Sequence, residues 1–124
     1  MDRLLAIALG GALGALLRYG VGTGVDRWLG RAFPWGTLLI NASGSLAMGM
    51  LYVLLVERGL LSPPLRAVLM VGLLGAFTTF STFSLETVHL LERGEAGRAA
   101  ANVFVSAGLC VFGCWLGLAL AREL

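Results

Sequence analysis

Four long apolar segments, separated by short polar connections, account for nearly all of the 124-residue chain. They cover roughly residues 4–24, 35–56, 65–91 and 99–121, and the connections are 26–34 (DRWLGRAFP), 57–64 (ERGLLSPP) and 92–98 (ERGEAGR). Each segment has about the 20 residues that a helix needs to cross a bilayer. A helix also satisfies its own backbone hydrogen bonds in lipid. The pattern therefore predicts an all-α integral membrane protein, with residues 1–124 forming a single domain of four transmembrane helices.

Composition also favours an integral membrane protein, surrounded by lipid. Charged residues make up 13% of the chain, whereas a soluble domain carries about 25%. The nine basic residues are all arginines without a basic run, so nucleic acid is not an expected partner. The first segment resembles the apolar part of a signal peptide, but three more follow, and we interpret it as a retained span.

The arginines are balanced between the two sides of the predicted membrane protein. One side has Arg3, Arg58, Arg66 and Arg122, and the other has Arg27, Arg31, Arg93 and Arg98. The positive-inside rule therefore gives no preferred orientation. A chain that inserts both ways round could pair into an antiparallel homodimer of eight helices, which is our hypothesis for the assembly.

Small residues recur four positions apart along the apolar segments. The pairs are Gly10 and Gly14, Gly20 and Gly24, Ser45 and Gly49, and Gly113 and Gly117. Such pairs let helix backbones approach closely in lipid. Together they indicate tight helix packing within the chain and between chains.

The stretch GAFTTFSTFS (75–84) places five hydroxyls and three phenylalanines inside the third apolar segment. Ser and Thr offer the backbone alternative hydrogen-bond partners, and Gly72 and Gly75 lie just upstream. We therefore expect a helix break near residues 75–80. A break frees carbonyl oxygens, which in a membrane need a partner such as another helix, water or a bound cation. Two breaks that face each other across a dimer axis could hold one cation.

Phe80 and Phe83 lie three residues apart and share a helix face if the helix resumes after the break. Aromatic rings have a positive edge, so ring edges beside hydroxyl and amide donors suit a small anion. Asn41, in the second span, could line such a pathway or join two helices. The alternative is that the phenylalanines are ordinary core and that the hydroxyls only join helices.

The remaining polar residues inside the spans give weaker signals. Asn102 and Ser106 lie four apart on one face of the fourth span and form a short polar track. Arg18 lies near enough to the end of the first span to extend to the interface. Cys110 and Cys114 are expected to be buried, small apolar side chains, because a bridge at this spacing would distort the helix and no histidine lies near enough to complete a metal site.

Several classes of protein lack their required residues here. The only histidine, His89, is near a span end without a nucleophile beside it, so we do not expect an enzyme. A small multidrug transporter has a similar size but needs an acid embedded in its first span. A membrane scaffold without transport is the other alternative, in which the Ser/Thr-rich stretch serves packing alone.

Three stretches resemble the signatures of the Fluc (CrcB) fluoride channel family: GGALGALLRY (10–19), FPWGTLLINASGS (33–45) and GAFTTFSTFSLE (75–86). Their order, spacing and four-span setting cover essentially the whole chain. The resemblance implies a dual-topology homodimer in the cell (plasma or inner) membrane. This homodimer would have two pathways and would passively export toxic fluoride from the cytoplasm.

The resemblance also implies roles for individual residues. Phe80 and Phe83 correspond to the paired pore phenylalanines, and Asn41 to the amide donor beside them. Gly75 and Thr78 correspond to the positions whose backbone carbonyls hold a central structural sodium ion, Na+. The other residues implied along the fluoride pathway are Ser81, Thr82, Ser106, Asn102, Arg18 and Glu86.

Overall fold

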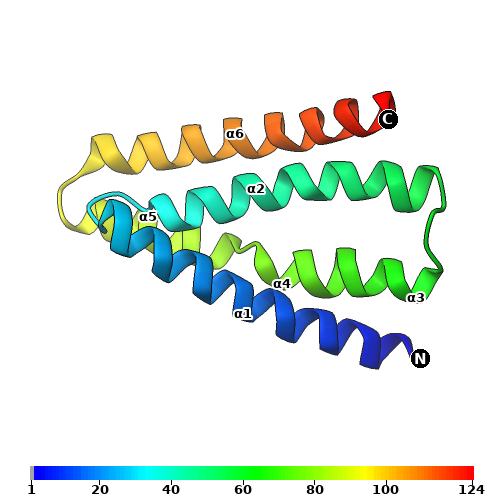
Figure 1. Cartoon of the computed structure of the whole chain (residues 1–124). Helices are drawn as coiled ribbons and strands as arrows, with labels where there is room; N and C mark the ends of the chain where they lie inside the picture. The colour runs from blue at the N-terminus through cyan, green and yellow to red at the C-terminus, as the bar shows by residue number, and fades with distance from the viewer. Residues whose placement is uncertain (1) are drawn as a thin grey trace.

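The computed structural model describes residues 2–124, which fold into helices and short connections (Figure 1). Helix α1 spans Arg3–Leu29, and α2 spans Trp35–Leu51 and continues as the π-helical turns of η1, Tyr52–Glu57. The next helical segments are α3 (Pro63–Arg66), η2 (Ala67–Leu74), α4 (Gly75–Phe77) and α5 (Phe80–Glu92). Helix α6 spans Ala96–Glu123.

Local sequence explains where the helices begin and end. The side chain of Asp2 accepts a hydrogen bond from the backbone N–H of Leu4 and caps α1. Gly30, with a φ of 78°, ends the same helix. Pro63 and Pro64 occupy the first turn of α3, where proline's missing N–H leaves no bond unmade.

The described chain has four helical stretches that are long and apolar enough to cross a membrane: Arg3–Leu29, Trp35–Glu57, Pro63–Glu92 and Ala96–Glu123. Each extends past the apolar residues that predicted it, because a helix continues through polar residues once it reaches the membrane surface. The two termini and the 58–62 connection lie at one end of the molecule (Figure 1).

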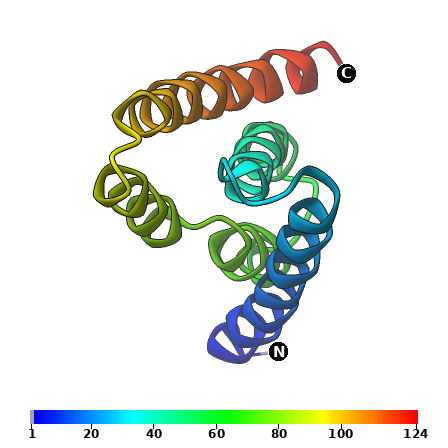
Figure 2. The same ribbon diagram turned by 90° about the vertical axis from the view of Figure 1, so that its left-hand side faces the viewer.

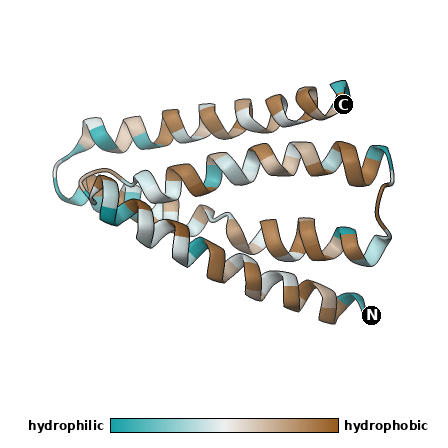
Figure 3. Cartoon of the chain, in the orientation of Figure 1, coloured by the Kyte–Doolittle hydropathy of each residue, from teal (hydrophilic) through white to brown (hydrophobic). Residues whose placement is uncertain are grey.

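Apolar side chains cover the outside of the molecule. Figure 3 shows apolar residues along most of each long helix, with polar residues concentrated toward the ends. Trp28 is 89% exposed and Phe104 is 75% exposed. An outer surface of this kind requires lipid or another protein chain around it, so the chain is a multi-pass membrane protein.

The helices pack as two close pairs, and α1 and α2 join the pairs by contacting each other. Helix α6 lies along α2, and α1 lies along η2 (Figures 1 and 2). A Cβ on Gly14 would overlap the carbonyl oxygen of Leu73, and a Cβ on Gly117 would overlap that of Leu46. These two glycines therefore set the distance between the backbones, as their spacing predicts. A Cβ on Gly20 or Gly24 would meet no atom of another segment within 4 Å in the described chain, so these two make no such contact within it.

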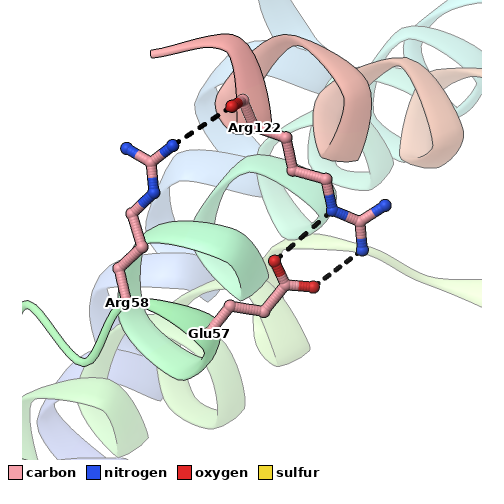
Figure 4. A network of polar contacts seen from close by, with 3 residues as sticks. All are labelled: Glu57, Arg58 and Arg122. Atoms are coloured by element: carbon pink, nitrogen blue, oxygen red, sulfur yellow. Dashed lines mark hydrogen bonds and ion pairs between the residues drawn. The ribbon is translucent and has the colours of Figure 1, made fainter.

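An ion pair joins the ends of the second and fourth spans (Figure 4). The Nη2 atom of Arg122 lies 2.7 Å from Oε1 of Glu57, and Nη2 of Arg58 donates to the carbonyl oxygen of Arg122 at 3.3 Å. The arginine and glutamate side chains are 54% and 36% exposed. Water screens such a pair strongly, so it fixes the position of the end of α6 more than it stabilises the fold.

Candidate functional site

The centre of the candidate site is a two-residue interruption between α4 and α5. Thr78 and Thr79 have extended backbones, with ψ angles of 153° and 117°. Thr79 then caps α5, because its Oγ1 accepts a hydrogen bond from the backbone N–H of Thr82 at 3.2 Å. The hydroxyl groups at the interruption thus form hydrogen bonds with backbone groups of the adjoining helices.

Asn41 holds the interruption against α2 through two hydrogen bonds. Its Oδ1 accepts from the backbone N–H of Thr79 at 2.8 Å, and its Nδ2 donates to the carbonyl oxygen of the same residue at 3.0 Å. Gly44, three residues further along α2, gives the space for this contact, because a Cβ there would overlap the methyl group of Thr78. Asn41 therefore joins two helical segments, and it also lines a groove.

The interruption releases backbone carbonyl oxygens from helical pairing. The N–H of Thr79, which would pair with Gly75, donates to Asn41, and the N–H of Thr82, which would pair with Thr78, donates to Thr79. Within residues 2–124, the carbonyl oxygens of Gly75 and Thr78 consequently receive no hydrogen bond. The carbonyl oxygen of Ala76, by contrast, accepts from Nε of Arg18 at 3.1 Å.

The two phenylalanines after the interruption form a pair beside the groove. The ring centroids of Phe80 and Phe83 lie 5.3 Å apart, with the ring planes tilted by 40°. Phe80 is 78% exposed, so within one chain little covers it. In a membrane protein such exposure leaves the ring facing lipid or a second chain.

The groove lies between α2, the interruption and α6, and has a volume of about 570 Å³. Its lining contains the amide of Asn41, hydroxyls, the phenylalanine pair and sulfur-bearing side chains; the residues are Asn41, Gly44, Ser45, Met48, Thr78, Thr79, Phe80, Phe83, Val103, Ser106, Ala107, Cys110 and Cys114. None of these described lining residues is charged. The groove therefore offers polar side chains and aromatic rings without a fixed charge.

A buried chain of hydrogen bonds continues from the groove along α6. Oγ of Ser106 donates to Oδ1 of Asn102 at 3.2 Å, and Nδ2 of Asn102 donates to Oγ1 of Thr87 at 2.9 Å. Asn102 is 2% exposed and is not among the residues that line the groove. It ties α6 to α5, while Ser106 reaches the groove itself. Sequence analysis did not identify Thr87, whose role depends on this contact between helices.

A second, polar cavity of about 270 Å³ lies on the other side of the interruption. It is lined by Arg18, Thr82 and Glu86 among the predicted site residues, together with Thr79. The Glu86 carboxylate accepts a hydrogen bond from the hydroxyl of Thr37 on α2. Thr79 lines both the cavity and the groove, so it is the wall between them.

The structure thus distributes the predicted site residues over two neighbouring spaces. Asn41, the phenylalanine pair and Ser106 line the groove, and Arg18, Thr82 and Glu86 line the polar cavity. Ser81 lines neither, although its Oγ lies 3.3 Å from Oγ1 of Thr79. Thr37 and Thr79 belong to the site as well, and only their contacts across the fold identify them.

The two cysteines differ from their predicted setting. Cys110 and Cys114 are both free thiols and both partly exposed, and both line the groove. The prediction of buried apolar side chains was therefore wrong. Their spacing places them on one face of α6, but sequence alone did not show that this face borders an open space.

Fold and site together define a small multi-pass membrane protein with a polar interruption in its third span and an uncharged groove beside it. The chain matches the family model for CrcB-like protein, Camphor Resistance (CrcB), over residues 5–118. It therefore belongs to the CrcB family, as the three sequence stretches indicated.

Three relatives carry the name fluoride-specific ion channel FluC. The protein of Methylococcus capsulatus is 55% identical over 121 residues, which are 98% of this chain and 53% of that protein. The protein of Rhodospirillum centenum is 52% identical over 98% of this chain and 97% of its own length. For Geobacter sulfurreducens the identity is 48%, over 100% of both chains. The chain thus spans about half of the first relative and nearly all of the other two.

The names of these relatives describe ion channels and no enzyme. This confirms the prediction that the chain is not an enzyme.

Proposed function

We propose that the chain is a subunit of a fluoride-selective channel, whose pathway runs along the groove beside the interruption. The main support for this proposal is the lining of the groove, which is uncharged and contains hydrogen-bond donors. Relatives that are 55% and 52% identical to this chain also carry the name fluoride-specific ion channel. Fluoride is small and strongly hydrated, so a narrow passage must replace its water with hydrogen-bond donors. Pore width and donor number then separate it from larger anions.

Fluoride would move between the polar cavity and the groove. Arg18 attracts the anion toward the cavity, and the hydroxyl of Thr82, which accepts from the hydroxyl of Thr79 and keeps its own hydrogen free, replaces part of its hydration shell. Beyond Thr79, the edges of Phe80 and Phe83 and the amide of Asn41 line the route toward Ser106. Glu86 faces the polar cavity and leaves the groove free of negative charge.

A second copy of the chain, inserted the opposite way round, completes the pathway. One chain leaves the groove open and Phe80 exposed, and unpaired carbonyl oxygens at an interruption are costly in lipid. Because the arginines are balanced between the two sides, neither orientation in the membrane is preferred, and the chain can insert both ways. The resulting antiparallel homodimer has two pathways.

The antiparallel assembly predicts that a C-terminal epitope is accessible from outside intact cells in roughly half of the chains. Accessibility in all chains or in none would contradict insertion in both orientations.

The carbonyl oxygens of Gly75 and Thr78 suit a structural sodium ion where the two chains meet. Unwound backbone carbonyls are known ligands of sodium in membrane proteins, and these two lack hydrogen bonds within residues 2–124. In the part of the chain described, no group of three or more His, Cys, Asp and Glu side chains is placed to hold a metal. Backbone carbonyl oxygens are therefore the ligands that we propose for the ion at the interruption.

The sodium site predicts a cation-dependent stability. A ligand that binds only the folded assembly raises its unfolding temperature. We expect the detergent-solubilised dimer to unfold at a higher temperature in sodium than in N-methylglucamine at matched ionic strength. Equal unfolding temperatures in the two media would rule out sodium as a structural component.

If fluoride flux needs no coupling ion, the channel exports fluoride passively down its gradient. Such export would protect the cell from fluoride toxicity. Fluoride efflux from proteoliposomes, read with a fluoride electrode, tests the function. We expect fast fluoride loss that is independent of an imposed proton gradient, with little chloride loss from parallel vesicles. Absence of fluoride loss from well-folded protein would indicate that the hydroxyl stretch only joins helices.

A further inference from the structure

Three sulfur-bearing side chains line the groove, outside the residues assigned to fluoride. Cys110 and Cys114 project from α6, and Met48 projects from α2. The thiols are free and partly exposed. Three soft ligands in the lining of an uncharged groove are a specific combination, and nothing in the proposed pathway requires them.

Close packing of α2 on α6 places the backbones that carry Met48 and Cys114 next to each other. Gly49, the residue after Met48, meets the carbonyl oxygen of Cys114 so closely that a Cβ would overlap it. Gly117 makes the same kind of contact with the carbonyl oxygen of Leu46. Met48 therefore extends from a backbone that touches α6 at the level of Cys114.

The spacing of the thiols suits a shared metal ion better than a disulfide. Residues four apart on a helix have Cβ atoms about 5–6 Å apart, whereas a disulfide needs roughly 3.5–4.5 Å. One ion with bonds of roughly 2.3 Å to each sulfur, as zinc thiolates have, spans the larger distance without bending the helix. The thioether of Met48 can then approach from the facing helix.

We propose that Met48, Cys110 and Cys114 form a binding site for a soft monovalent cation of the cuprous or silver type. Thiolate and thioether ligands select such ions, and the groove lining offers neither carboxylate nor imidazole to a harder one. On binding, the S–H bond of a cysteine breaks, the sulfur–metal bond forms, and the proton passes to water. One thiolate neutralises the charge of the ion, which suits an uncharged groove.

Silver binding to the purified, reduced protein in chloride-free nitrate buffer tests the site. We expect one silver ion per chain, and we expect that single ion to protect both thiols from maleimide, as counted by mass spectrometry. Binding should tighten as the pH rises, because it releases a proton. Two ions per chain, each protecting one thiol, would show independent cysteines and overturn the proposal, as would the absence of binding.

Matched variants separate the site from general thiol reactivity. Either Cys110→Ser or Cys114→Ser should weaken silver binding by at least about 10- to 100-fold, the loss usual even for groups that only surround metal ligands. Met48→Leu should weaken it less, and Met70→Leu, which changes a methionine outside the groove, should leave it unchanged. Full affinity in both serine variants would overturn the site.

The effect of the ion on transport rests on the proposed function, whereas binding does not. Cys110 lies one turn beyond Ser106 on the same face of α6, so a bound ion narrows the route proposed for fluoride. Silver should therefore slow fluoride efflux in the parent protein but not in the Cys110→Ser, Cys114→Ser double variant, relative to the silver-free rate of each. Binding without slowing would leave the metal site intact and place the fluoride route elsewhere.

Discussion

Phe80→Ile is expected to reduce fluoride flux by at least about tenfold, which corresponds to a barrier increase of about 1.4 kcal/mol. The substitution removes a ring whose electropositive edge is proposed to face the anion, and an aliphatic side chain provides no such edge. Phe83→Ile should act in the same way, because its ring lies 5.3 Å away in the same groove. Fluoride efflux from proteoliposomes measures both.

The assembled protein should survive these substitutions. Phe80 is 78% exposed within the chain, so its truncation removes little packing inside one subunit. Phe112→Ile is the matched control, because Phe112 pairs with Trp115 at 5.8 Å on α6 and lies outside the groove. Light scattering should report dimers for all three variants. Unchanged flux in both groove variants would remove the rings from the pathway.

Asn41→Asp is expected to suppress flux even more strongly, because it introduces a negative charge on the proposed anion route. Two like charges about 4 Å apart repel by roughly 4 kcal/mol at the effective dielectric constant typical of proteins. The aspartate also loses the Nδ2 bond to the carbonyl oxygen of Thr79, although it can still accept from the N–H of that residue.

Asn41→Ser separates the two consequences, since serine shortens the side chain without adding charge. The serine variant should retain more flux than the aspartate variant. Equal suppression in both would assign the effect to the lost contact with Thr79 and not to charge. Normal flux in the aspartate variant would remove Asn41 from the pathway altogether.

Sequence alone could predict the parts of the structure that depend on local composition. Hydropathy and length predict four apolar helices, and the spacing of Gly10 with Gly14 and of Gly113 with Gly117 predicts helix packing. The resemblance in three short stretches predicts the CrcB family. Each of these inferences needs only neighbouring residues, because helix formation and lipid burial act along the chain.

The arrangement of the site depends on contacts that neighbouring residues do not determine. Asn41 meets Thr79 across 38 positions, and Thr37 meets Glu86 across 49. These contacts divide the polar residues between two spaces and make Thr79 the wall between them. The accessibility of Cys110 is likewise a product of how α6 lies on α2, which explains why the prediction of its burial failed.

The central claim is that the groove beside Thr78 and Thr79 forms, in the assembled protein, a channel selective for fluoride. The reversal potential of the purified protein in a planar bilayer tests this most directly, with fluoride and chloride gradients set in opposite directions and the pH then varied on one side. We expect a reversal potential close to the equilibrium potential of fluoride that does not move with the pH gradient. A reversal potential that follows chloride or the proton gradient, or no current from dimeric protein, would contradict the claim.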